Sequence, residues 1–365
     1  MSLTGGACRR LGIRDGFVRK LIEDIAALIA GATELRSSVI ERQLELAERQ
    51  HESVGRYWRG SRRGIGIPTS AFRGSSLYNF PEVEPVRVFR TSGTSGTTRG
   101  IAAYSPDGMA LLDAAILRQA RRHLSSNRDA HSLACIRIIP ASETVPDVIM
   151  AYGMELIAKE LGVPHLSGTA FDGFRFDVNR LEVLVSRALA ENVPILLMGS
   201  TFGVVNACDA IAERKLRFDL PEGTTLLDAG GLKNRARALT GKQYLELVGQ
   251  TFGSLRCINL FGMTELVSQL YDSPVESDGT PNARIKGPAD WAWPTVREPE
   301  SLMPTTNGIG LLEITDLAIV DRPSFVLSDD IARGTPVGAT ILGRALGSPT
   351  RGCALHIESL AEEAS

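Results

Sequence analysis

Residues 194–214 read PILLMGSTFGVVNACDAIAER, and this stretch decides the fold class. Residues 194–198 form a fully apolar run that ends at Gly199, which predicts a strand buried on both faces. Ser200 stands where a side-chain oxygen can cap a helix, and residues 201–214 carry apolar residues at helical spacing. The stretch therefore predicts a strand, a turn and a helix, the repeating unit of a parallel α/β sheet.

The same unit recurs on both sides of this stretch. Thr240 and Gln243 form a capping box at the start of one of the predicted helices. Because apolar strands alternate with helices, we expect a three-layer α/β fold with largely parallel sheets and helices on both faces. After about residue 305 short strands (310–315, 324–327 and 340–342) predict a β-rich C-terminal segment. The other predicted strands are 133–139, 224–227 and 255–260, and the other predicted helices are 147–161, 178–192 and 241–252.

Glycine-rich or polar turns follow four of these strands, at 140–144, 199–201, 230–233 and 262–265. In parallel sheets of this kind, ligands bind at the carboxyl ends of the strands. A binding site is therefore expected where these turns meet. The turns at 140–144 and 198–202 could line a pocket for an organic substrate, or they could be ordinary connections.

Charge, hydrophobicity and cysteine content argue against several classes of protein. The 365 residues include 40 basic and 42 acidic side chains, a net charge of −2, so no nucleic-acid partner is expected. No run approaches the ~18 apolar residues of a membrane-spanning helix, and the N-terminus lacks the apolar region of a secretory signal, so no membrane partner is expected. The cysteines form no CxxC pair, which favours a reduced, cytoplasmic protein. They are Cys8, Cys135, Cys208, Cys257 and Cys353.

The densest local signal is the loop at 91–100, TSGTSGTTRG, with six hydroxyl side chains and three glycines. Glycines let backbone N–H groups approach phosphate oxygens, hydroxyls donate further hydrogen bonds, and Arg99 adds positive charge. The loop predicts a phosphate-binding site, although it lacks the lysine of the P-loop NTPases. The alternative is a flexible linker. The expected nucleotide-binding residues here are Thr91, Ser92, Gly93, Thr94, Ser95, Gly96, Thr97, Thr98 and Arg99.

Three motifs, in order, resemble those of the adenylate-forming superfamily, which includes acyl-CoA ligases and amino-acid adenylation domains. The loop at 91–100 resembles its phosphate loop, residues 261–265 (FGMTE) its Tyr-Gly-x-Thr-Glu motif, and residues 328–333 (SDDIAR) its Thr-Gly-Asp-Leu-Gly-Arg motif. The resemblance implies that Glu265 binds Mg²⁺ and that Asp330 binds the ribose hydroxyls, with Asp329 as the alternative. The residues implied to surround the adenine are Phe261, Gly262, Met263 and Thr264.

The chain further resembles the acyl-protein synthetase of bacterial bioluminescence fatty-acid reductase systems, over roughly residues 85–360. This likeness rests on residues 228–233 (DAGGLK), 261–271 (FGMTELVSQLY), and a tail with Gly343-Arg344 and 351–353 (RGC). That family resembles the N-terminal domain of the larger enzymes without their mobile C-terminal domain, and we expect the same of this chain. Gly230, Gly231 and Arg344 are accordingly expected at the nucleotide.

The resemblance implies two half-reactions, with ATP and Mg²⁺ as cofactors. A carboxylic acid, in that family a fatty acid, forms acyl-AMP, and the acyl group then passes to Cys353 and on to a partner protein, a reductase or a carrier. Arg351 and His356 near Cys353 would favour its thiolate, although most cysteines are simply buried. Lys233 is the expected catalytic cation beside Glu265, and a plain surface lysine is an equal alternative.

Departures from the family leave the acid undefined. Arg99 replaces the usual lysine, Leu232 a common aromatic residue, and Phe261 a tyrosine. Two other functions stay open: an acyl- or aryl-CoA ligase-like enzyme that uses coenzyme A or a carrier protein, and a non-catalytic nucleotide-binding scaffold. The expected organisation is an N-terminal helical and loop region (1–80), an α/β nucleotide- and acyl-binding core (81–305), and a β-rich C-terminal subdomain with the candidate acyl acceptor (306–365).

Overall fold

The computed structural model describes residues 15–73, 77–91, 99–125, 131–231, 239–273 and 284–345. In it, residues 194–214 form strand β8 (Ile195–Ser200) and helix α7 (Thr201–Glu213). The Ser200 side chain accepts a hydrogen bond from the backbone N–H of Gly203, so the predicted helix cap is confirmed. The capping box of Thr240 and Gln243 is confirmed at the start of α8 (Gly241–Phe252).

Strand β8 lies inside a sheet of order β11-β10-β9-β8-β4-β5. The neighbours from β10 to β5 pair in parallel, and only β11 at the edge is antiparallel. The predicted largely parallel sheet is therefore confirmed for this half of the molecule. Its other strands are β4 (Ala134–Ile138), β5 (Gly168–Thr169), β9 (Thr225–Ala229), β10 (Arg256–Phe261) and β11 (Leu270–Tyr271).

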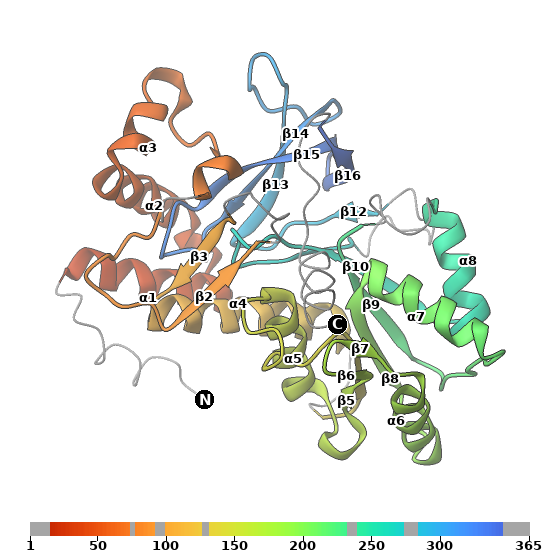
Figure 1. The fold of residues 1–365 in the computed structure, drawn as a ribbon. Coiled ribbons are helices and arrows are strands. Elements are labelled where there is room, and N and C mark those ends of the chain that lie inside the picture. Colours follow the sequence, from red (N-terminus) through yellow and green to blue (C-terminus); the bar gives the residue numbers. More distant parts are fainter. Residues whose placement is uncertain are drawn as a thin grey trace.

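Helices cover both faces of this sheet, as the apolar strands require. Successive residues of β8 point to opposite faces, so Ile195 and Leu197 join one core cluster and Leu196 and Met198 the other. The first cluster packs under α6 (Val178–Ala190), α7 and α8, and the second under α4 (Pro106–Leu124) and α5 (Ile149–Leu161). Figure 1 shows these two groups of helices on opposite sides of strands β8–β10.

A second sheet, order β12-β16-β15-β14-β13, is antiparallel and forms the C-terminal part of the fold. The expectation of largely parallel sheets is therefore wrong for this half. The sheet also recruits strands from before residue 306, because β1 pairs in parallel with β15. Its strands are β1 (Ile67–Pro68), β12 (Ile285–Lys286), β13 (Ala292–Arg297), β14 (Ile309–Asp316), β15 (Phe325–Thr335) and β16 (Gly338–Arg344).

Two small hairpins and the N-terminal helices complete the fold. The hairpins are β2 (Arg87–Arg90) with β3 (Ile101–Tyr104), and β6 (Phe171–Asp172) with β7 (Arg175–Phe176). Helices α1 (Gly16–Ala30) and α2 (Arg36–Gln50) lie in the region expected to be helical and loop, and they contribute to the core cluster that contains Leu196 and Met198. The remaining helices are α1 (Gly16–Ala30), α2 (Arg36–Gln50), α3 (Glu52–Tyr57) and the short 3₁₀ turns η1 (Thr33–Leu35), η2 (Gly60–Arg62), η3 (Thr69–Phe72) and η4 (Pro164–Leu166).

Candidate functional site

The hydroxyl-rich loop connects the two strands of the β2–β3 hairpin. At its base the backbone N–H of Thr91 donates to the carbonyl of Gly100 at 2.9 Å, and the N–H of Gly100 donates to Thr91 Oγ1 at 2.8 Å. These two bonds hold the ends of the loop together. Arg99, next to Gly100, is half-buried. Ser92, Gly93, Thr94, Ser95, Gly96, Thr97 and Thr98 lie outside the described residues.

Glu265 lies directly beside the base of this loop. A side-chain carbon placed on Gly100 would lie 3.4 Å from Glu265 Oε1 and 3.0 Å from the methyl group of Thr91. The base of the loop therefore lies within van der Waals reach of the Glu265 carboxylate. Two motifs separated by more than 160 positions in the sequence therefore meet at Gly100.

The Glu265 carboxyl group is buried among positive charges. Burial raises its pKa, and the cationic side chains of Arg322, Arg344 and Arg73 act in the opposite direction. Arg73 reaches this point because it forms an isolated β-bridge with Gly100. In the part of the chain that the structure describes, Glu265 makes no ion pair within 4.0 Å, so its carboxylate faces the loop without a direct cationic partner.

The third motif reaches the same place through Arg344. Asp330 and Arg344 are cross-strand partners on β15 and β16, with 3.6 Å between Arg344 Nε and Asp330 Oδ1. The Asp330 side chain is only 3% exposed, and its N–H donates to Ser328 Oγ at 3.0 Å. Arg344 also acts electrostatically on Glu265, so the charge of this arginine links the third motif to the second. Asp329, the alternative to Asp330, is half-buried on the same strand.

The FGMTE motif begins at the end of β10. Phe261 still pairs with Leu270 of β11, and the chain then turns, with the N–H of Leu266 donating to the carbonyl of Met263. Thr264 is buried and Gly262 is exposed. This turn presents Glu265 at the carboxyl end of a parallel strand, where the sequence predicted a site.

The neighbouring turn after β9 is held by a buried asparagine. Gly230 has φ +92°, a conformation that favours glycine, and its N–H donates to the carbonyl of Leu260. Asn259 Nδ2 donates to the Gly230 carbonyl at 3.0 Å and to Asp228 Oδ2 at 2.8 Å. Gly231 is exposed beside it. Leu232, the candidate Lys233 and the candidate Cys353 lie outside the described residues.

A buried polar network lies under this turn, and sequence reasoning missed it. Lys286 of β12 is 3% exposed and donates to Asn259 O, Asn259 Oδ1 and Asp272 Oδ1 at 2.9, 2.6 and 2.6 Å. Arg284 lies 3.3 Å from Asp228 Oδ1. Since β12 belongs to the antiparallel sheet and Asn259 to the parallel one, Lys286 joins the two sheets.

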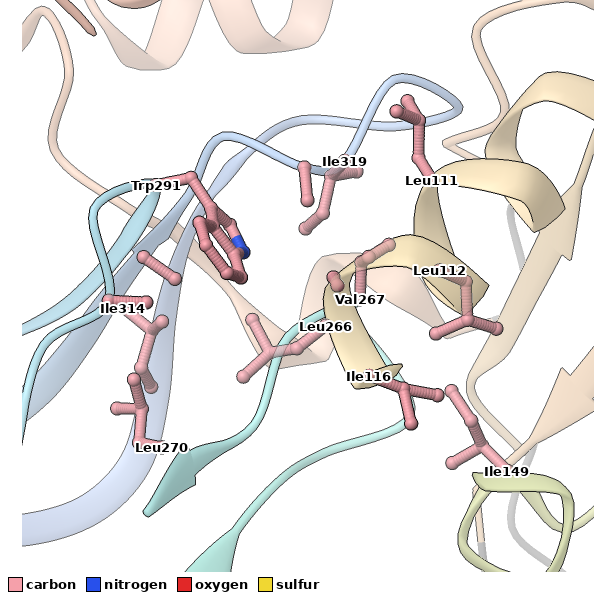
Figure 2. Close-up of a cluster of buried hydrophobic side chains, with 14 of the residues drawn as sticks. Leu111, Leu112, Ile116, Ile149, Leu266, Val267, Leu270, Trp291, Ile314 and Ile319 are labelled. Atoms are coloured by element: carbon pink, nitrogen blue, oxygen red, sulfur yellow. The ribbon is translucent and has the colours of Figure 1, made fainter. Parts of the chain in front are cut away.

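The segment after Glu265 is anchored by a second residue that had no sequence signal. Asp316, fully buried at the end of β14, accepts hydrogen bonds from the backbone N–H groups of Val267 and Ser268 and from Ser268 Oγ, at 2.8, 2.7 and 2.8 Å. Leu266 and Val267 point into the core between α4 and the strand residues around Trp291 (Figure 2). The position of Glu265 is therefore set by packing and by buried hydrogen bonds.

The described cysteines are unreactive. Burial raises the pKa of the Cys135, Cys208 and Cys257 thiols to about 12, 11 and 12, so none is a thiolate near neutral pH. Among the described residues no group of three histidine, cysteine, aspartate or glutamate side chains is suited to hold a metal ion. No helix within the described ranges is long and apolar enough to cross a membrane.

Comparison with known proteins adds to this geometry. No protein-family model and no curated protein matches the sequence. Among solved structures, 2-hydroxyisobutyryl-CoA ligase, in an open conformation with 2-HIB-AMP and CoA, is similar over 91% of this chain and 76% of that chain, at 16% identity and a TM-score of 0.53.

Two further structures match over a shorter span. ATP-bound MatB from Rhodopseudomonas palustris matches 70% of this chain and 47% of its own at 19% identity and a TM-score of 0.48. A long-chain-fatty-acid-CoA ligase from Archaeoglobus fulgidus matches 73% of this chain and 52% of its own, at 13% identity and a TM-score of 0.49. This chain therefore spans about half the length of MatB. The likeness to 2-hydroxyisobutyryl-CoA ligase shows that the chain shares the mixed α/β fold of that structure.

Proposed function

We propose that this protein activates a carboxylic acid with ATP and forms an acyl-adenylate. The observation that carries the proposal is the meeting of three separate motifs around one buried carboxylate. Gly100 of the hydroxyl-rich loop lies beside Glu265, and Arg344, which pairs with Asp330, acts electrostatically on the same carboxylate. Hydroxyl, carboxylate and arginine groups at one point are what a nucleotide with a bound cation requires.

In the proposed reaction a carboxylate oxygen of the acid attacks the α-phosphorus of ATP. The bond from that phosphorus to its bridging oxygen breaks, and pyrophosphate leaves with the electron pair. Residues of such a site act mainly by positioning and by neutralising charge. Thr91, with the loop it closes, would hold the phosphates, Asp330 the ribose hydroxyls, and Arg344 would balance the negative charge.

The residues fit a magnesium ion at Glu265. Mg²⁺ prefers oxygen ligands and is commonly bound by one or two carboxylates together with substrate phosphates. Glu265 offers a buried carboxylate without an ion-pair partner among the described residues, aimed at the base of the loop. When bound, the ion would neutralise part of the negative charge of the phosphates.

The second proposed step is acyl transfer to Cys353. The thiolate would attack the acyl carbonyl carbon, form a thioester and release AMP, and a partner protein, a reductase or carrier, would accept the acyl group from there. The raised pKa values of the three described cysteines argue against them, because a thiol must ionise to act. Of the remaining Cys8 and Cys353, the resemblance of residues 351–353 to the acyl-protein synthetases favours Cys353. Lys233 remains the proposed cation at the phosphates. A fatty acid is the proposed substrate and the cytoplasm the proposed compartment.

Pyrophosphate exchange with a panel of carboxylic acids tests the first step. The wild type should exchange with at least one acid. Glu265→Gln should lower the exchange rate by roughly a hundredfold or more, the scale seen when one group that stabilises transition-state charge is lost. Asp330→Asn should raise the KM for ATP while Asp329→Asn does not. No exchange with any acid would leave the non-catalytic scaffold as the better account.

Intact-mass spectrometry tests the second step. After incubation with MgATP and the active acid, the protein should gain one acyl mass that hydroxylamine removes. Cys353→Ser should abolish this gain and keep pyrophosphate exchange, and the buried Cys257→Ser serves as the control that keeps both. Exchange without any acylation in the wild type would favour the alternative, transfer to coenzyme A or a carrier protein.

A further inference from the structure

A buried arginine outside the three motifs connects the Glu265 segment to β3, the strand that follows the hydroxyl-rich loop. Arg322 lies in the connection between β14 and β15 and is 2% exposed. Its Nε donates to the backbone carbonyl of Glu265 at 2.9 Å, and its Nη2 donates to the hydroxyl of Tyr104 at 2.7 Å. Two donors of one rigid guanidinium group therefore bind two segments that are far apart in the sequence.

Tyr104 is the second member of this arrangement. It ends β3, the strand that follows the hydroxyl-rich loop, and it is completely buried. Its hydroxyl donates to the carbonyl of Leu266 at 3.1 Å, and its ring lies under the guanidinium carbon of Arg322, 4.5 Å from the centroid. Burial raises the pKa of Tyr104 to about 12, so the phenol keeps its proton and remains a donor.

The contacts form a closed set between β3 and residues 265–266. Arg322 binds the carbonyl of Glu265, Tyr104 binds the carbonyl of Leu266, and the two side chains bind each other. Moving β3 relative to the Glu265 segment would break at least one of these buried hydrogen bonds, each of which leaves an unpaired group at a cost of roughly 1–3 kcal/mol.

The charge of Arg322 is not explained by fold stability alone. In the described ranges no carboxylate forms an ion pair within 4.0 Å of it, and burying an uncompensated cation is unfavourable. The acidic groups that act on it electrostatically are Glu265 and the adjacent Asp321. Arg322 donates to the backbone carbonyl of Glu265 and its charge acts on the Glu265 carboxylate, so both interactions point to a role towards Glu265.

We propose that Arg322 is a positioning residue that sets the distance between the phosphate-side hairpin and the Glu265 carboxylate, with Tyr104 as its partner. This inference rests on the proposed adenylation and deepens it, since the same carboxylate is the proposed magnesium ligand. Lysine cannot replace arginine here, because a single ammonium point charge cannot reproduce the two directed N–H groups of the fork.

The test compares Arg322→Met, Arg322→Lys and Tyr104→Phe with the matched control Arg297→Met. Arg297 is also a largely buried arginine, 15% exposed, and it binds Glu313 and the carbonyl of Leu302 instead of Glu265 and Tyr104. Two quantities are measured on the full chain: the Mg²⁺ concentration for half-maximal ATP binding by calorimetry, and the same value for pyrophosphate exchange.

Both Arg322 variants should raise the half-maximal Mg²⁺ concentration by roughly 10- to 100-fold, the range found when groups that orient metal ligands are changed. Tyr104→Phe should shift it in the same direction by less, and it keeps the test decisive if Arg322→Met does not fold. Arg297→Met should lose stability in urea and keep the wild-type Mg²⁺ dependence.

The outcomes separate this inference from the proposed function. If the wild type exchanges pyrophosphate but the Arg322 variants behave like Arg297→Met, the positioning role is overturned and adenylation stands. If the wild type neither exchanges pyrophosphate with any acid nor binds MgATP, both fail. If Arg322→Lys matches the wild type in both measurements, charge alone suffices and the geometric argument is wrong.

Discussion

Replacing Lys286 by methionine should destabilise the protein by about 3 kcal/mol, the lower end of the range for breaking a buried ion pair. Its ammonium group makes three short hydrogen bonds, at 2.9, 2.6 and 2.6 Å, and its side chain is 4% exposed. Removing it leaves the 9% exposed Asp272 carboxylate without its closest cation. The lower end applies because Asp272 keeps the N–H of Asn259 at 2.8 Å and the more distant Arg284.

Urea unfolding at neutral pH measures this change. The double variant Lys286→Met/Asp272→Asn should recover part of the loss, because it removes the uncompensated charge together with its partner. Lys242→Met is the control: Lys242 is 81% exposed and lies 3.8 Å from Glu246, so its loss should change stability by no more than about 0.5 kcal/mol. A loss below about 1 kcal/mol for Lys286→Met would refute the claim that this lysine joins the two sheets.

Three further changes have effects that follow from single observations. Asp316→Ala should lower the free energy of unfolding in urea by about 2–4 kcal/mol, because it leaves the buried N–H groups of Val267 and Ser268 and the Ser268 hydroxyl without their acceptor. A loss under about 1 kcal/mol would contradict the proposed anchoring. Burial lowers the pKa of His123 from 6.5 to about 4. The neutral imidazole therefore contributes fully to the free energy of unfolding above pH 6.5, and this contribution is lost as the pH falls towards 4. After allowance for partial exposure, the free energy of unfolding should fall by about 1 kcal/mol between pH 7 and pH 5 because of His123. His123→Gln should lack this pH-dependent loss in urea unfolding. A side-chain carbon on Gly310 would lie 2.0 Å from a backbone carbonyl oxygen, so Gly310→Ala should lower the melting temperature, whereas Gly249→Ala, with open space in α8, should raise it or leave it unchanged.

The strand and helix units of the parallel sheet could be predicted because their signals are local. An apolar run, a terminal glycine and a capping hydroxyl lie within a few residues of one another, as at Gly199 and Ser200. The predicted strand at 194–198 and helix at 201–214 differ from β8 and α7 by no more than two residues at any end. The capping box at Thr240 was correct for the same reason.

The antiparallel sheet could not be predicted to the same extent. Residues 324–327 were expected to form a short strand, yet β15 continues to Thr335 and carries the whole SDDIAR motif. Burial alternates along the second half of β15, but a polar residue, Asp330, occupies one of the buried positions, so no apolar alternation marks the strand in the sequence. The strand extends because β14 and β16 pair along it. Such pairing joins distant positions, for instance Ile67 with Val326, and no local pattern reveals it.

The sequence by itself determined the class of fold, because strand and helix signals are local, and it predicts which motifs carry chemistry from hydroxyls, glycines and carboxylates at fixed spacings. Only the tertiary structure decided that Gly100 touches Glu265 and that Arg322 and Lys286 are buried beside the site. A lysine or arginine in sequence reads as a surface charge. Its burial depends on partners from other strands, and those partners exist only after the chain has closed on itself.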